Sequence, residues 1–123
     1  MAEYDHYIDG EWVAGEGEDF ASENPATGET LGTFPRGTES EVGGAIEAAN
    51  DAYEEWRELS YVDRAEYLWE IYHELRDRHE ELGEIVTKEC GKEISEGKAD
   101  VTEAWHMVEW AAGDARQIGR AHV

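Results

Sequence analysis

Cys90 is the single cysteine of this 123-residue chain and so its one candidate thiol nucleophile. A catalytic thiol needs a lowered pKa and an ordered base partner. Lys92 lies two positions further on, but no His or Asn partner can be identified in the sequence. We therefore expect Cys90 to be a structural residue, either buried or at a helix end.

Two other motifs come close to known chemistry without completing it. Residues 73–77 read His-Glu-Leu-Arg-Asp, with Asp77 where a zinc-protease helix carries its second histidine, so we expect a solvated helix face. The other histidines do not fall at the spacing of metal ligands: His6, His79, His106 and His122. Residues 15–17, Gly-Glu-Gly, lack the third glycine and the following helix of a phosphate-binding loop.

The charge balance limits the partners of the protein. The chain carries 31 acidic and 10 basic residues, a formal net charge of −21, and the acids are scattered along it. Nucleic acid and anionic membranes would repel such a chain. Molar salt shortens the Debye length to about 3 Å and removes most of the self-repulsion, so we expect a salt-adapted protein. The alternative is a stand-alone acidic helical module that binds a partner protein, for which blocks of five or six charges are typical.

Targeting signals are not evident in the sequence. The amino terminus has neither the basic start nor the apolar run of a signal peptide, and no segment approaches the roughly 20 apolar residues of a membrane span. A single cysteine excludes an intrachain disulfide. We therefore expect a cytoplasmic protein that does not enter membranes.

Residues 1–36 show the pattern of strands and turns. An Asp-Gly pair at positions 9–10 lies between Tyr-Ile at 7–8 and Trp-Val at 12–13, which predicts a hairpin. Short strands are expected at 20–22 and 31–34, on either side of the Asn-Pro-Ala-Thr-Gly turn at 24–28.

Residues 37–123 change to a helical period. Thr38 with Glu41 forms a capping box, and Ser60 with Asp63 resembles another capped start. The first helix is predicted to place its apolar residues on one face: Val42, Ala45, Ile46, Ala49, Tyr53 and Trp56.

The later helices are predicted from the same signals. A break is expected near His79, and Gly91 is placed to end a helix in left-handed geometry. A final helix should run from about Ser95. Its buried side is predicted to hold Val101, Ala104, Trp105, Val108, Ala111, Ala112, Ala115 and Ile118.

A few short strands cannot cover the apolar faces of three or four helices unless the helices pack on one another. Residues 119–123 carry no helix stop signal. We therefore expect the chain to be one part of a larger domain and to be poorly packed by itself.

Several short segments, in this order, resemble the start of the aldehyde dehydrogenase superfamily. They are Tyr-Ile-Asp-Gly-Glu-Trp at 7–12, Glu-Asn-Pro-Ala-Thr-Gly-Glu at 23–29, Trp-Arg at 56–57, Asp-Arg-Ala-x-x-Leu at 63–68, Glu-Cys-Gly-Lys at 89–92, Glu96, Asp-Val at 100–101 and Trp-Ala-Ala-Gly at 110–113. The resemblance extends to about Arg116. The Glu-x-Gly-Lys-x-x-x-Glu-Gly form at 89–97 is similar to the branch that acts on semialdehydes or bulky acidic aldehydes.

The resemblance implies an α/β fold, in which residues 1–123 form the N-terminal portion of a cofactor-binding domain and the catalytic domain is absent. The parent enzyme would oxidise an aldehyde to a carboxylic acid with NAD or NADP, through a cysteine thiohemiacetal, as a homo-oligomer (dimer or tetramer). Neither the Pro-Trp-Asn loop nor the Gly-Gln-x-Cys segment of such enzymes occurs here. The chain alone is therefore predicted to be inactive and to hold no catalytic or cofactor-binding residue.

The resemblance also implies two candidate sites. Ser22, Glu23 and Glu89 correspond to residues that hold a monovalent cation in some family members, and hard oxygen ligands suit such an ion. The last helix borders the aldehyde access tunnel in the family. This makes Glu103 a substrate-tunnel candidate, near Trp105 and Met107, although core packing is the simpler role for Trp105.

Overall fold

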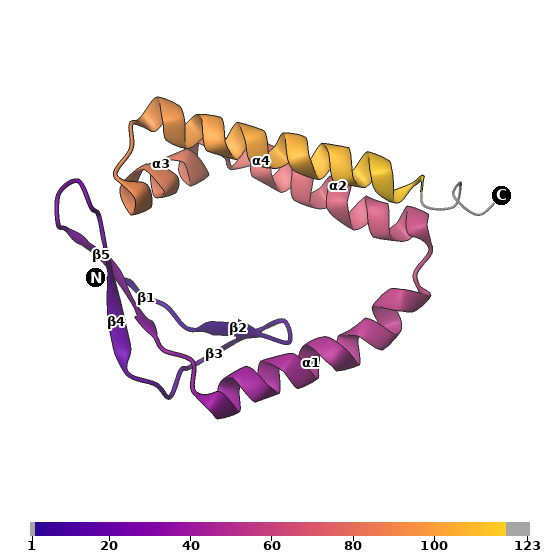
Figure 1. Cartoon of the computed structure of the whole chain (residues 1–123), viewed down its shortest axis with the longest axis horizontal. Coiled ribbons are helices and arrows are strands. Elements are labelled where there is room, and N and C mark those ends of the chain that lie inside the picture. Colours follow the sequence, from indigo (N-terminus) through magenta and orange to yellow (C-terminus); the bar gives the residue numbers. More distant parts are fainter. Residues whose placement is uncertain (1, 118–123) are drawn as a thin grey trace. The chain divides into compact units, whose positions relative to one another are not determined.

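A computed structural model describes residues 2–117 of the chain (Figure 1). Within them, short strands precede helices, which confirms the predicted α/β class. The strands are β1 (Ala2–Glu3), β2 (His6–Ile8), β3 (Glu11–Val13), β4 (Asp19–Glu23) and β5 (Thr30–Pro35). The helices are α1 (Glu39–Glu58), α2 (Tyr61–Asp77), α3 (His79–Cys90) and α4 (Ile94–Ala115). The chain divides into two compact units, Met1–Glu58 and Leu59–Val123.

β5 is the central strand of the larger sheet in the first unit. It pairs parallel with β1 and antiparallel with β4, where Phe20 lies opposite Phe34. The Phe34 ring stacks on Tyr4, with ring centroids 4.7 Å apart, and on Phe20 at 5.7 Å. Both strands predicted here are confirmed, each one residue longer at either end. β1 was not predicted, because two residues are too few to show an alternating pattern.

β2 and β3 form the predicted hairpin, with Tyr7 opposite Trp12. Asp9 and Gly10 have φ angles of 52° and 78°. Positive φ at both central positions is what a type I′ turn requires, and its twist matches that of the two strands. The hairpin therefore follows directly from local sequence.

α1 begins at the predicted capping box. The Glu41 N–H donates to Thr38 Oγ1 at 3.3 Å, and the Thr38 N–H donates to Glu41 Oε2 at 2.7 Å. No residue of α1 is buried. Ile46 and Tyr53 of its apolar face keep 57% and 56% of their surface exposed. These exposures agree with the expectation that this face lacks a cover.

The helix boundaries of the second unit also follow the sequence signals. Ser60 caps α2 by accepting the Asp63 N–H at 3.1 Å. A single residue, Arg78, separates α2 from α3, which confirms the break predicted near His79. Gly91 ends α3 with a left-handed φ of 67°, as predicted.

α4 packs against both α2 and α3 in the second unit (Figure 1). The buried residues at this interface are small: Ala65 and Ala112 have no exposed surface and Val101 keeps 5%. Trp105, Val108, Ala111 and Ala115 are half-buried. Ala104 is exposed, which corrects the prediction for that residue, because it lies at the edge of the narrow stripe that faces the other helices. Ile118 lies outside the described residues.

Among residues 2–117 no helix combines the length and the apolar character that a membrane crossing needs.

Candidate functional site

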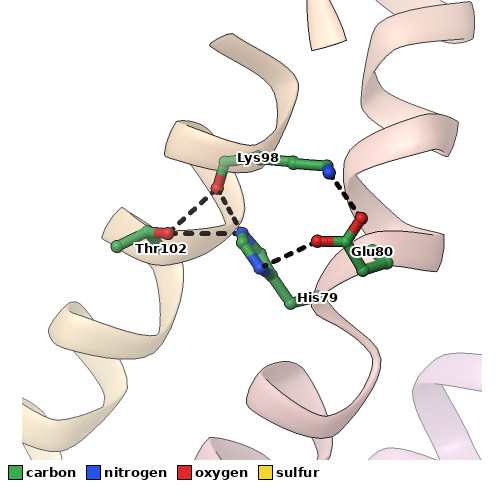
Figure 2. Close-up of polar contacts among 4 residues, drawn as sticks. All are labelled: His79, Glu80, Lys98 and Thr102. Atoms are coloured by element: carbon green, nitrogen blue, oxygen red, sulfur yellow. Dashed lines mark hydrogen bonds and ion pairs between the residues drawn. The ribbon is translucent and has the colours of Figure 1, made fainter. Parts of the chain in front are cut away.

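A polar cluster of the second unit joins the start of α3 to α4 (Figure 2). His79 Nε2 lies 2.9 Å from the Lys98 carbonyl oxygen, and Thr102 Oγ1 donates to the same oxygen at 3.0 Å. Lys98 Nζ forms an ion pair with Glu80, whose other oxygen lies 3.9 Å from His79 Nδ1. We call these four residues the His79 clasp.

The chemistry of the clasp follows from its acceptors. A carbonyl oxygen only accepts hydrogen bonds. The hydrogen of this bond is therefore on His79 Nε2, which donates it in a hydrogen bond to the Lys98 carbonyl oxygen. This nitrogen then has no lone pair to take the Thr102 proton, although the two atoms are 3.4 Å apart. The hydrogen bond from Lys98 lowers the pKa of the Glu80 carboxyl below its ordinary value. The arrangement is suited to joining two helices and not to nucleophilic catalysis.

Small residues and one aromatic ring complete the crossing of α3 and α4. Gly83 and Gly97 are both buried, and a Cβ at position 97 would lie 2.6 Å from the Gly83 carbonyl oxygen. The Trp105 indole meets the His79 ring edge-on, with centroids 4.9 Å apart. The two helices therefore touch through their backbones at one end and through aromatic rings at the other. This confirms a packing role for Trp105 against α3.

A second polar centre lies in the first unit, at Glu41. Its carboxylate accepts the N–H and hydroxyl of Thr38, both at 2.7 Å, and the Glu16 N–H at 2.8 Å. These bonds, with Thr38 contributing most, lower the pKa of Glu41 to about 2. His6 Nε2 is buried without a hydrogen-bond partner among the described residues and lies 3.9 Å from Glu41 Oε1. Glu41 thus ties the residue 15–17 loop to the start of α1.

The predicted cation ligands are not gathered within either unit. Ser22 and Glu23 end β4 at a shift in strand register, whereas Glu89 belongs to the last turn of α3 in the other unit. Across residues 2–117, no three His, Cys, Asp or Glu side chains gather as metal ligands. The cation site stays a prediction from the family resemblance.

The other residues singled out from the sequence lie at exposed positions. Cys90 is the last residue of α3 and is exposed, so the helix-end alternative is confirmed and the buried one is wrong. Residues 73–77 form the exposed end of α2 apart from the half-buried Leu75. Glu103 and Met107 lie one turn apart on α4, both exposed.

An apolar groove of about 400 Å³ runs along α2 and into α3. Its walls are Tyr67, Glu70, Ile71, Glu74, Leu75, Arg78 and Leu82. Neither this groove nor the His79 clasp was predicted. The signal available for the clasp was the pair Lys98 and Thr102, one turn apart on a helix that also carries Gly97.

A unit of strands with one helix, followed along the chain by a unit of helices, is the arrangement of an α/β protein. Residues 12–123 match the sequence profile of the Aldehyde dehydrogenase family. The chain belongs to this family, as the resemblance indicated.

Three similar proteins illustrate the match. Malonate-semialdehyde dehydrogenase 1 of Geobacillus kaustophilus is 38% identical over 109 residues, which are 88% of this chain and 22% of that protein. Succinate-semialdehyde dehydrogenase (NADP+) of Escherichia coli is 35% identical over 90% of this chain and 23% of its own length. The crystal structure of an NAD-dependent aldehyde dehydrogenase from Sinorhizobium meliloti has a TM-score of 0.88 at 28% identity, covering 94% of this chain and 24% of its own.

The chain thus spans less than a quarter of the length of the two curated relatives. The comparisons support the enzyme family and give no support to the stand-alone acidic module.

Proposed function

We propose that this chain serves as the segment that supports the cofactor-binding domain in an enzyme that oxidises an aldehyde to a carboxylic acid. The family match over residues 12–123 carries this proposal. In such chemistry a cysteine thiolate adds to the aldehyde, hydride passes to the nicotinamide, and water releases the acid. The chain lacks the Gly-Gln-x-Cys segment that would supply this cysteine. We therefore propose that it is inactive by itself.

NAD or NADP is the proposed cofactor of that enzyme. The names of two similar proteins support this, one NAD-dependent and one NADP+-dependent. The Glu16 N–H between the glycines at 15 and 17 is donated to Glu41, so it is not available to a phosphate. We propose that this chain makes no contact with the cofactor in that enzyme.

The proposed substrate is an aldehyde that also carries an acidic group. The relatives that support this are a malonate-semialdehyde and a succinate-semialdehyde dehydrogenase. Glu103 is proposed to border the access path, and its exposed place on α4 leaves it available for such a role. Replacing it by Gln in the full enzyme should change the ratio of kcat/KM values between acidic and neutral aldehydes. An unchanged ratio would remove Glu103 from the path.

The cation site is a separate proposal that rests on the family resemblance. Ser22, Glu23 and Glu89 would supply oxygen ligands to sodium or potassium in the full enzyme. A crystal of that enzyme soaked in a thallium or rubidium salt should show anomalous density beside Glu89. If other sites in the same crystal are fully occupied by the heavy cation and no anomalous density lies beside Glu89, the proposed cation site is wrong.

We further propose that the protein works as a homo-oligomer, dimer or tetramer, in a salt-rich cytoplasm. The net charge of −21 supports the salt requirement, because self-repulsion falls as salt shortens the Debye length. Circular dichroism melts between 0.1 and 3 M KCl should show a higher Tm at high salt. A Tm that falls or stays level would contradict salt adaptation.

The proposed function is tested by an assay with two arms. The chain alone, given NAD+ or NADP+ and a panel of semialdehydes, should produce no nicotinamide reduction above background. A chimera should retain semialdehyde oxidation when the matched segment of the Geobacillus relative is replaced by this chain. Turnover by the chain alone, or a folded chimera without activity, would contradict the proposal.

A further inference from the structure

The break between α2 and α3 occurs without a helix-breaking residue at the joint. Residues 74–82 contain neither glycine nor proline. The Arg78 N–H donates to Glu74 O at 3.0 Å and the Leu82 N–H to Arg78 O at 2.9 Å, so helical bonding reaches the joint from both sides. Arg78 itself has φ −99° and ψ 17°, in the bridge region outside the helical one, so a continuous helix requires its ψ angle to change. A continuous helix through Arg78 is therefore compatible with this sequence.

The break also leaves hydrogen-bonding groups without helical partners. The first N–H groups of any helix have no partner within it. Arg78 is the N-cap of α3 and makes no side-chain cap hydrogen bond. A continuous helix would pair the amides of residues 79–81 with carbonyls of α2. Tertiary contacts must therefore offset the free energy of the helical hydrogen bonds that the break removes.

Those contacts are the His79 clasp and the glycine beside it. His79 donates to the Lys98 carbonyl, Glu80 pairs with the Lys98 ammonium, and Gly83 lies against the Lys98 backbone. The residues that α3 contributes to these contacts, His79, Glu80 and Gly83, lie within five residues of the joint. The clasp is thus placed to hold the start of α3 against α4 and away from the axis of α2.

The groove described above spans the same joint. Tyr67, Ile71, Leu75 and Leu82 are spaced by 4, 4 and 7 residues, which is one stripe on a continuous helix. We propose that the joint at Arg78 is a conformational switch governed by the His79 clasp. With the clasp closed, α2 and α3 are two helices with a groove across the joint. With the clasp open, they join into one helix and the groove becomes a flat stripe.

The switch can be measured with two spin labels on the full 123-residue chain. Cys90 is exposed at the end of α3, and Val62, 41% exposed near the start of α2, can be replaced by cysteine. Residues 62 and 90 would be about 42 Å apart on a straight helix, at 1.5 Å for each of 28 residues. In His79→Ala the label distance should lengthen toward that value, and the amides of residues 79–81 should gain protection from hydrogen exchange.

Two further variants separate the switch from general damage. His73→Ala changes a histidine whose described contact is the neighbouring Tyr72 ring, and it should keep the parent distance. Arg78→Ser supplies a helix N-cap that favours the break, so adding it to His79→Ala should restore the shorter distance. An unchanged distance and unchanged exchange in His79→Ala would overturn the proposal. So would a loss of helical circular dichroism in that variant, because the proposal predicts that helix is gained.

Discussion

The two units of this chain hold their helices by different means. In the second unit, α3 and α4 meet through Gly83 and Gly97, and Ala65, Ala112 and Val101 are buried. In the first unit, α1 has no buried residue and is fixed at its start by hydrogen bonds around Glu41. The difference teaches that a helix can be placed either by close packing along its length or by polar bonds at one end. Only close packing along its length covers one face of the helix.

The largest effect should come from filling the contact between α3 and α4. Gly97→Ala puts a methyl group against the Gly83 carbonyl and the Thr87 backbone, and such overpacking costs about 3 kcal/mol of unfolding free energy. Gly113→Ala, on the same helix with open space around it, should instead gain about 1 kcal/mol. Urea denaturation followed by circular dichroism measures both. Equal effects at the two glycines would refute the close contact.

The next effect compares an apolar side chain from each unit. Val101 is 5% exposed, and Val101→Ala should lower the unfolding free energy by about 2 kcal/mol. Ile46 on α1 is 57% exposed, and Ile46→Ala should stay within about 0.5 kcal/mol. If Ile46→Ala proved as damaging as Val101→Ala in the same denaturation experiment, the α1 face would be covered in solution.

Helix caps should matter equally in both units. Thr38→Ala removes the cap of α1 and Ser60→Ala removes that of α2, each at a cost of about 1 kcal/mol. Hydrogen exchange of the first-turn amides reports each loss separately. If only one of the two substitutions weakened the protection of its first-turn amides, the start of the other helix would be stabilised by contacts other than its cap.

The smallest effect should be that of the Glu41 charge. Because the folded pKa is about 2 and the ordinary value is 4.5, the ionised carboxylate stabilises the first unit above pH 4.5. This contribution is lost as the pH falls from 4.5 toward 2. The stability difference between the parent and Glu41→Gln should therefore narrow over that window. A difference that stays constant from pH 7 to pH 2 would mean that the charge is not responsible.

The secondary structure could be predicted where single residues carry strong local preferences. The Asp9-Gly10 hairpin, the Thr38 and Ser60 caps and the Gly91 helix end depend only on neighbours a few residues away. Each prediction was confirmed because the deciding atoms lie within one turn of the chain.

The candidate sites could be predicted less well. The His79 clasp joins residues up to 23 positions apart, and the Glu16 to Glu41 bond spans 25. The predictions that Cys90 could be buried and that Ala104 is buried were both wrong. The helical period shows the direction in which a side chain leaves the helix axis, but it does not show whether another segment covers that side.

Local sequence patterns were enough to predict the helices and all strands but β1, two helix caps, the strongly acidic charge and, through the order of short motifs, the enzyme family. These are set by backbone preferences, residue counts and the order of short segments. The tertiary structure decided which apolar faces are covered, that two glycines bring α3 onto α4, and that a histidine after an uncapped joint bonds to a backbone carbonyl of another helix. Such contacts depend on the meeting of segments distant in the chain, which no local pattern specifies.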